Sequence, residues 1–331
     1  MTAQAVLLTG ASGFIGRATV LQLRARGFAV RAVVRRAQSI PGEWAQDPEI
    51  TPVICDLAHS DLDLVGVDCV IHAAASLAGG DTQQARDTIT ATHTVLRAIN
   101  TQSKPPHLIL LSSITVYDTL SLPVGATLDE DTALEPNSAQ RDAYCRAKIA
   151  QETVVQESAN DVGFPLTILR AGAVFGPDRV WNDHIGVALG PVLLRFGARG
   201  QVPLCALGQC ATALVRAVET PPVPNGPHIV NVLDDDLPNR KRFVQILRNS
   251  GWPKRVLPLP WRALDILARI VSILPVKAPG LLRRPVLHAR LKPLKYSNAR
   301  LHDLYGLESE FWFETAMLRA IDPTIFEPKN D

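Results

Sequence analysis

The chain has 331 residues, 47% of them apolar and 20% charged, and a net charge of +2 at neutral pH. These values are typical of a globular protein, and so small a charge does not favour a nucleic-acid-binding one. The five cysteines show neither a disulfide framework nor zinc-ligand spacing, so we expect no metal site. No apolar run approaches the roughly 18 residues that span a bilayer, and Met1 leads directly into an apolar strand. We therefore expect a cytoplasmic protein.

The first half of the chain alternates short apolar runs with helical periodicity, the pattern of a parallel α/β sheet. We expect strands over Ala5–Thr9, Ala29–Val34, Pro52–Ile54, Cys69–His72, Leu108–Leu111 and Leu166–Leu169. We expect helices over Phe14–Arg26, ended by Gly27, over residues 83–100 and over Arg141–Ser158. Six strands joined by right-handed crossovers make a doubly wound sheet.

After Arg170 the rhythm changes, because prolines and glycines become frequent and strand candidates become sparse. One apolar run, His228–Val232, predicts a late strand that returns to the same sheet. We therefore predict a first domain over residues 1–170, completed by the strand near 228–233. A smaller, mainly helical lobe over 171–227 and 234–331 is expected to cover the carboxyl edge of the sheet and to bind the substrate.

A glycine-rich loop lies between the first strand and the first helix. It contains Gly10, Ser12, Gly13, Phe14, Ile15 and Gly16. Gly10 permits a tight turn, Gly13 lets the backbone approach a pyrophosphate, and Gly16 lets the helix pack close to the strand. The free N–H groups and the positive end of the helix dipole then face the phosphates. This context predicts a Rossmann-type dinucleotide site.

The residues at the end of the second strand indicate how the adenosine ribose of such a cofactor is bound. An acidic residue there binds the 2′-hydroxyl of NAD, whereas arginine accommodates the 2′-phosphate of NADP. The sequence gives Arg35 and Arg36 with no neighbouring carboxylate. We therefore expect NADP, with NAD as the alternative. The competing interpretation is that Arg35 and Arg36 are solvated arginines that bind no phosphate.

Tyr144 and Lys148 are four residues apart, so they lie on one face of the predicted helix. A phenol with a pKa of about 10 transfers protons poorly at neutral pH, and a nearby ammonium would lower that pKa. A hydroxyl from another element is needed to orient the substrate oxygen. Ser113 and Thr115 follow the fifth strand, where a doubly wound fold places such groups. Tyr144 and Lys148 are thus candidates for an acid–base pair.

In this order the motifs resemble the extended short-chain dehydrogenase/reductase family, also called the NAD-dependent epimerase/dehydratase family. They are TGASGFIG (9–16), CDL (55–57), HAAA (72–75), SSITVY (112–117), YCRAK (144–148) and LRAGAVFGP (169–177), and the resemblance covers nearly the whole chain. It implies a catalytic Ser113, Tyr144 and Lys148, the last two also touching the cofactor. It further implies adenine contacts at Asp56 and Leu57 and dinucleotide contacts at Ala73, Ala74, Ala75, Ala171, Ala173 and Val174.

The resemblance also implies a homodimer in which the helices near 83–100 and 141–158 form a four-helix interface. One departure from the family pattern bears on the substrate. Sugar-nucleotide epimerases of the family usually carry an asparagine that contacts the diphosphate, and this chain has Ala173 there. That change argues against ordinary sugar-nucleotide recognition.

The carboxyl-terminal part combines an amphipathic helix with a basic stretch. Residues Trp261–Leu274 have a wide apolar face that we expect to pack on its own lobe; an apolar substrate pocket, a subunit contact and a peripheral membrane contact are the alternatives. Between Asp265 and Asp303 there is no carboxylate, whereas this gap contains Lys277, Arg283, Arg284, Arg290, Lys292, Lys295 and Arg300. They could clamp a diphosphate, face anionic lipid or be solvated. We take Thr115 and Arg290 as candidate substrate contacts.

Three functions fit the sequence. The first is an NADP-preferring oxidoreductase that acts on a small-molecule ketone or secondary alcohol, with Tyr144 as acid and base. The second is a nucleoside-diphosphate-sugar epimerase or dehydratase that retains its cofactor, which the basic stretch favours. The third is a non-catalytic dinucleotide-binding protein, which the Ser–Tyr–Lys set disfavours.

Overall fold

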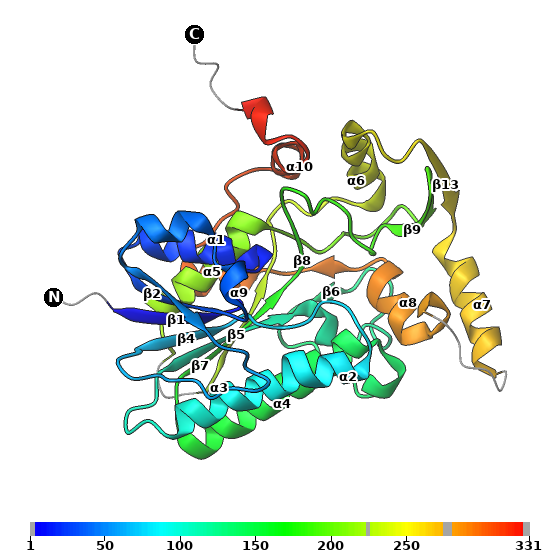
Figure 1. Cartoon of the computed structure of the whole chain (residues 1–331). Helices are drawn as coiled ribbons and strands as arrows, with labels where there is room; N and C mark the ends of the chain where they lie inside the picture. The colour runs from blue at the N-terminus through cyan, green and yellow to red at the C-terminus, as the bar shows by residue number, and fades with distance from the viewer. Residues whose placement is uncertain (1–3, 223–225, 274–279, 327–331) are drawn as a thin grey trace, which may run out of the picture.

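The computed structural model describes residues 4–222, 226–273 and 280–326, and its centre is a sheet of seven parallel strands (Figure 1). In spatial order these are β3 (Ile50–Ile54), β2 (Ala29–Val34), β1 (Ala5–Thr9), β4 (Cys69–His72), β5 (His107–Ser113), β7 (Leu166–Ala171) and β12 (His228–Val232). The strand order reverses between β1 and β4, which makes the sheet doubly wound. The late strand is confirmed, since β12 pairs with β7 in parallel.

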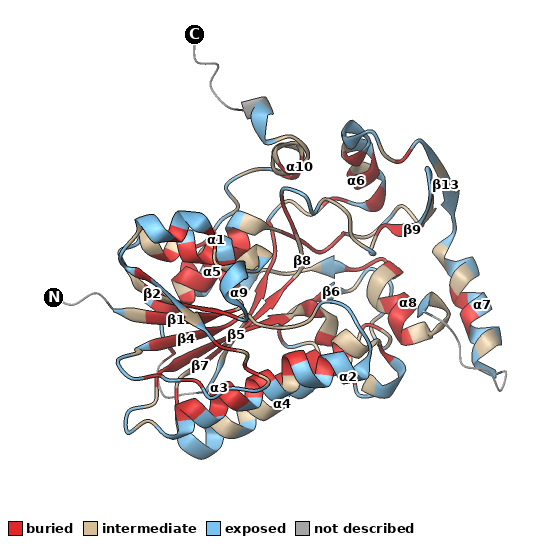
Figure 2. Ribbon diagram, in the orientation of Figure 1, coloured by how far each residue is buried: buried red, intermediate tan, exposed pale blue. Residues whose placement is uncertain are grey.

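Alternating side chains of the buried strands enter two separate cores. On β1, Val6 and Leu8 face the core under α1 (Phe14–Ala25), α5 (Leu207–Glu219) and α9 (Ala299–Tyr305). Leu7 faces the opposite core, which α3 (Ala91–Asn100) and α4 (Ala143–Val162) cover. Figure 2 shows the buried residues concentrated on the strands and on the helix faces turned toward them. This two-sided burial is why the strands have continuous apolar sequences.

Two expected helices differ from the structure in their limits. The segment near 83–100 is α2 (Asp81–Gln84), a π-helical stretch over Ala85–Thr90 and then α3. The Thr90 hydroxyl donates to the carbonyl of Ala85, five residues earlier, which matches the wider π-helical turn. The other helix, α4, begins at Ala143, where the Asp142 side chain caps it, and runs to Val162 before Gly163 takes a left-handed conformation.

The region after Arg170 contains short strands that the sequence did not predict. A three-stranded sheet has the order β13 (Arg255–Leu259), β10 (Val192–Phe196), β9 (Gly186–Leu189), and β8 (Ala173–Phe175) pairs with β11 (Leu204–Ala206). A further pair joins β14 (Lys295–Tyr296) to β6 (Thr127–Leu128). These strands have two to five residues and lie among frequent prolines and glycines, so they do not stand out in the sequence as the apolar runs of the central sheet do. The helices here are α6 (Arg240–Leu247), α7 (Trp261–Ile273), α8 (Arg284–Leu291) and α10 (Phe313–Ile321).

Two segments assigned to the lobe lie on the central sheet. Helix α5 packs against α1, and Leu301 and Tyr305 of α9 belong to the same core as β1. The division of the chain into two domains therefore stays a prediction.

Helix α7 packs on its own lobe with only part of its apolar surface, because Trp261, Leu264 and Ala268 lie in one cluster with Leu287 and Leu291 of α8. Asp265 and Ala268 are buried, but Ile266, Ile270 and Ile273 are exposed. Leu274, the expected end of this helix, lies outside the described residues. No helix in the described part of the chain is long and apolar enough to cross a membrane.

Candidate active site

A cavity of about 980 Å³ opens at the carboxyl edge of the central sheet, and it brings together most of the predicted site residues. Its lining includes Gly10, Gly13, Phe14, Ile15, Gly16, Arg35, Ala73, Ala75, Ser113, Thr115, Tyr144, Lys148, Ala171, Ala173, Val174 and Arg290. Five predicted residues do not line it: Ser12, Arg36, Asp56, Leu57 and Ala74. Parallel strands release their loops at this edge, which is where doubly wound folds bind ligands.

The glycine-rich loop leaves no room for a side chain at Gly10 or Gly16. A Cβ on Gly16 would lie 2.1 Å from the carbonyl oxygen of Gly10, and a Cβ on Gly10 would lie 2.9 Å from the nitrogen of Ala74. Gly10 also has a φ of +69°, which favours glycine. Gly13 begins α1 without a side-chain cap, so the first N–H groups of that helix are open to a ligand. These features fit the pyrophosphate of a dinucleotide.

Tyr144 extends from the first turn of α4, and Ser113 from the end of β5. The Ser113 Oγ accepts a hydrogen bond from the backbone nitrogen of Thr115, at 3.3 Å, which holds it at the cavity wall. Burial raises the pKa of the Tyr144 phenol to about 12, although a hydrogen bond from Ser113 lowers it. The net lowering of this pKa that we expected from Lys148 is not observed, because desolvation disfavours the buried phenolate. The neutral phenol is a proton donor.

Lys148 is buried and lies four residues after Tyr144 on α4. Its Nζ donates to the carbonyl of Leu111 and to the side-chain oxygen of Gln151, both at 2.8 Å. An ammonium has three N–H donors, so one remains for a ligand in the cavity that Lys148 lines. Burial lowers the pKa of Lys148 to about 8, and the negative charge of Glu152 acts in the opposite direction. Lys148 is therefore a cation at neutral pH that loses its proton in mildly alkaline solution.

Gln151 connects Lys148 to a buried chain of hydrogen bonds that the sequence did not predict. The Gln151 Nε2 donates to the Thr92 hydroxyl at 2.8 Å, and that hydroxyl donates to the carbonyl of Thr88 at 2.7 Å. His72 Nε2 lies 3.0 Å from the same hydroxyl, and His72 Nδ1 lies 2.8 Å from the Thr9 hydroxyl.

Since the Thr92 proton goes to Thr88, His72 must donate from Nε2 and accept at Nδ1. Burial lowers the pKa of His72 to about 3, so this ring is neutral, as the donor pattern requires. The spacing of three between Lys148 and Gln151 was the one signal in the sequence for this arrangement.

Another part of the cavity lining contains Arg35 and an acidic residue, Asp87. Arg35 lines the cavity, half exposed, and its guanidinium lies 3.5 Å from a carboxylate oxygen of Asp87. Asp87 also accepts two hydrogen bonds from Arg86, and these bonds lower the pKa of Asp87. The sequence shows no carboxylate beside Arg35, but the fold brings one from the segment after β4. Arg36 is exposed and outside the cavity.

The two candidate substrate contacts both lie on the cavity but have partners. The Thr115 Oγ1 accepts from the buried Arg141 at 3.0 Å, and Arg290 forms an ion pair with Asp183 at 3.1 Å. The sequence did not indicate Arg179, Trp181, His184 or Tyr296, which line the same cavity. They lie in loops or on the two-residue strand β14, neither of which has a periodic pattern in the sequence.

The basic stretch after Asp265 does not form one free cationic cluster. Arg284 binds Asp265 itself, Arg300 pairs with Asp131, and the Lys292 Nζ donates to the carbonyls of Thr119 and Leu120. Lys277 lies outside the described residues. Most of these partners come from segments far away in the sequence. Counting the charges of the stretch alone therefore overestimated the positive electrostatic potential at the site.

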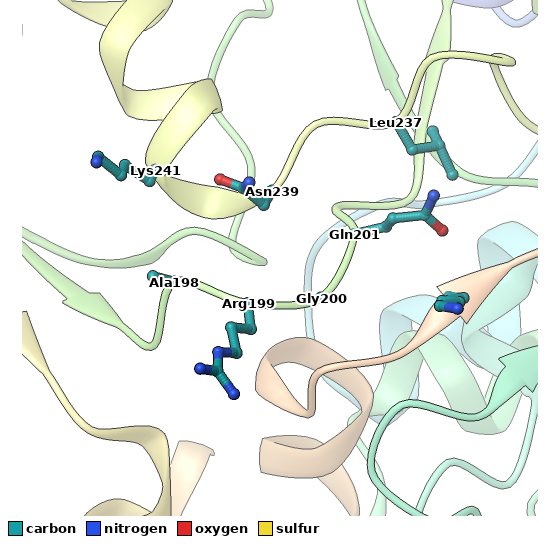
Figure 3. Close-up of a pocket in the computed structure, with 8 residues that line it drawn as sticks. Ala198, Arg199, Gly200, Gln201, Leu237, Asn239 and Lys241 are labelled. Atoms are coloured by element: carbon teal, nitrogen blue, oxygen red, sulfur yellow. The ribbon is translucent and has the colours of Figure 1, made fainter.

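A second cavity, of about 510 Å³, lies in the carboxyl-terminal part, lined by Arg199, Gln201, Asn239, Lys241 and neighbouring residues. Figure 3 shows the side chains of Arg199 and Lys241 pointing away from one another. They do not converge as a phosphate site requires. Among the described residues, no group of His, Cys, Asp and Glu could hold a metal ion.

Comparisons with known proteins agree with this geometry. The model of the NAD dependent epimerase/dehydratase family matches residues 6–232. The dTDP-6-deoxy-L-talose 4-dehydrogenase (NAD(P)(+)) of Kitasatospora kifunensis is 25% identical over 79% of this chain and 87% of its own length. Cinnamoyl-CoA reductase 1 of Petunia hybrida is 25% identical over 93% of this chain and 88% of its own.

Among solved structures, the UDP-glucuronic acid 4-epimerase of Bacillus cereus in complex with NAD superposes with a TM-score of 0.72. It is 19% identical over 96% of this chain and 98% of its own, which shows a shared fold. These similar proteins are a dehydrogenase, a reductase and an epimerase, the first and last of which are named with NAD(P)(+) or NAD, and this chain is an enzyme of the same general kind. It belongs to the NAD dependent epimerase/dehydratase family.

Proposed function

We propose that this enzyme transfers hydride between a nicotinamide dinucleotide and a ketone or secondary alcohol, with Tyr144 as its acid and base. The observation that carries the proposal is that Tyr144, Ser113 and Lys148 line the same cavity as the glycine-rich loop. The cofactor, when bound, supplies or accepts the hydride. Side chains of this chain hold the substrate and transfer the proton.

In the reductive direction the substrate carbonyl oxygen lies between the Ser113 and Tyr144 hydroxyls. Ser113 donates a hydrogen bond that holds and polarises the oxygen, and Tyr144 gives it a proton as the carbonyl carbon receives the hydride. The phenolate that remains is stabilised by the Lys148 ammonium, and it regains a proton from solvent. The third N–H of Lys148 would also hold the nicotinamide ribose, so that one cation serves both purposes.

We further propose that NADP is preferred, with Arg35 as the residue that binds the 2′-phosphate. Arg35 lines the cavity and is half exposed, which leaves its guanidinium accessible to a phosphate. Its only ionic neighbour among the described residues is Asp87, at 3.5 Å, a weak contact that a dianionic phosphate can replace. Arg36, outside the cavity, has a smaller part in this proposal than the sequence suggested.

A sugar-nucleotide epimerase or dehydratase is the second candidate. Arg179, His184 and Arg290 line the outer part of the cavity, where cations and donors could face a diphosphate. Against it, Arg290 is already paired with Asp183, and Ala173 offers no side-chain donor. The similarity to a UDP-glucuronic acid 4-epimerase supports the shared fold and leaves the substrate open.

One experiment separates the two candidates. The purified enzyme is denatured and the released nicotinamide is measured; then NADPH oxidation is followed with a panel of ketones and with nucleotide sugars. A reductase exchanges its cofactor in each turnover, so we expect little released cofactor and NADPH oxidation with at least one ketone. Stoichiometric bound cofactor, together with interconversion of nucleotide sugars without net NADPH oxidation, would overturn the proposal in favour of the second candidate.

A further inference from the structure

The outward face of α7 is apolar. At 100° per residue, Ala263, Ile266, Leu267, Ile270 and Ile273 share an arc of roughly 120° opposite the buried Asp265 and Ala268. Ile266 is 59% exposed, Ile270 54% and Ile273 83%. A helix on the surface of a globular protein normally has charged residues on this arc. Figure 2 shows α7 at the margin of the molecule, next to β13, whose Leu257 and Leu259 are also exposed.

The charges around this face are positive. From Leu237 to His302 the sequence has fifteen of the chain's 34 Lys and Arg but one of its 32 Asp and Glu, so this stretch carries +14 and the rest −12. Several of these cations are paired elsewhere, but Lys254, Arg255 and Arg262 are exposed and form no ion pair with any described residue. Arg262 borders the apolar arc of α7, and Lys254 and Arg255 lie at the start of β13.

The one carboxylate on α7 cannot oppose an anionic partner. Asp265 is buried and bound by Arg284, Arg269 and His288, at 3.0, 3.3 and 2.7 Å. The exposed face therefore offers aliphatic side chains bordered by free cations and no accessible negative charge on the helix. An aliphatic arc with a cationic border matches the acyl chains and anionic headgroups of a lipid surface.

We propose that α7 binds the enzyme peripherally to an anionic phospholipid membrane, lying in the interface with Ile266, Ile270 and Ile273 among the acyl chains. Lys254, Arg255 and Arg262 contact the lipid phosphates at the border of the helix, their aliphatic stems extending along the apolar surface. The contact is reversible, because one amphipathic helix buries far less apolar area than a membrane-spanning segment. It does not depend on which substrate the active site accepts.

The test is co-sedimentation of the full chain with vesicles of phosphatidylcholine, alone or with about 30% phosphatidylglycerol. We expect binding to the anionic vesicles that weakens as salt rises to about 0.5 M. The double variant Ile266→Ser/Ile270→Ser should bind about tenfold more weakly or worse. The variant Lys254→Gln/Arg262→Gln should lose binding severalfold on anionic vesicles. The matched control is Leu21→Ser/Val65→Ser, which alters two exposed aliphatic residues away from α7 and should bind like the wild type.

A spectroscopic measurement does not rely on the serine variants. The five native cysteines are buried, so Ile270→Cys offers a single accessible thiol for an environment-sensitive fluorophore, with Leu21→Cys as control. We expect the emission at position 270, and not at 21, to rise and shift to the blue with anionic vesicles. Wild type that stays in the supernatant, serine variants that sediment unchanged, or an unmoved emission at 270 overturns the proposal. If the wild type is a dimer, the Ile266→Ser/Ile270→Ser variant is a monomer and vesicles bind neither protein, the apolar face of α7 is an interface between two copies of this chain, and the membrane proposal is overturned.

Discussion

At the scale of single residues, the site depends on how Lys148 is held. Its ammonium is buried, and two of its three donors are satisfied by Leu111 and Gln151. Gln151 in turn has its orientation fixed by Thr92, because its amide nitrogen must donate there. We infer that Gln151 is a positioning residue, acting on the reaction through Lys148.

This role predicts a change in the pH profile. As pH rises through about 8, Lys148 loses its proton, and the rate should fall with it. Gln151→Leu removes an acceptor that stabilises the ammonium, so the pKa of Lys148 should drop and the alkaline limb of kcat should move to lower pH. Gln156→Leu, on the same helix but bonded only to the Glu152 carbonyl, is the control. An unmoved alkaline limb in the Gln151 variant would contradict the role.

Cofactor choice is a second question at this scale. A charged hydrogen bond to phosphate contributes roughly 1.5–3 kcal/mol, so Arg35→Ala should weaken NADP binding by about tenfold or more. NAD binding should hardly change, because NAD lacks the 2′-phosphate. Arg36→Ala, outside the cavity, should have the smaller effect. Equal affinities of the wild type for both cofactors, measured by titration calorimetry, would show the assignment to be wrong.

At the scale of elements, the junction of β1 and α1 is the part of the site most narrowly fixed by sterics. The Cβ of an alanine at 16 would lie 2.1 Å from the Gly10 carbonyl and 2.8 Å from the Ala11 Cα, both backbone atoms that cannot move without the loop. The sequence predicted this junction because the glycine spacing, the strand and the helix are all local. The Tyr144–Lys148 pair was predictable for the same reason.

Gly16→Ala should therefore destabilise the fold and weaken cofactor binding. We expect a loss of about 1–3 kcal/mol or more in the free energy of unfolding, since overpacking forces the backbone apart. Gly208→Ala, in the first turn of α5 with nothing within 4 Å of the new Cβ, should be neutral or slightly stabilising. Denaturant titrations of the two variants check this; similar midpoints would contradict the steric argument.

Other parts of the site could not be predicted, because their partners come from distant segments. Arg35 meets Asp87 across 52 positions, and Glu152 is bound by Arg170 and Ser112, which stand on two different strands. The donor and acceptor pattern of the neutral His72 ring depends on hydroxyls from β1 and α3. No spacing in the sequence encodes such contacts; they follow from the order of the strands in the sheet.

At the scale of the whole molecule, the homodimer expected from the family stays a prediction. Helices α3 and α4 lie side by side on one face of the sheet (Figure 1), and both turn exposed residues to solvent, among them His93 and Arg97 on α3 and Ala150 and Thr153 on α4. Light scattering should give a dimer at micromolar concentration. Ala150→Arg should dissociate it, whereas Ala25→Arg, at an exposed site on α1, should not. A monomer in the wild type would count against this interface.

Tyr144→Phe tests the proton transfer at the centre of the proposed reaction. The variant keeps the ring that lines the cavity and removes the hydroxyl that, in the proposed reaction, protonates the substrate oxygen beside Ser113. With a ketone identified by the panel, single-turnover oxidation of bound NADPH should slow by at least about 10²-fold, while the affinity for NADPH stays within about twofold. A Tyr144→Phe enzyme that reduces the ketone at near wild-type rate would contradict the assignment of Tyr144 as the acid.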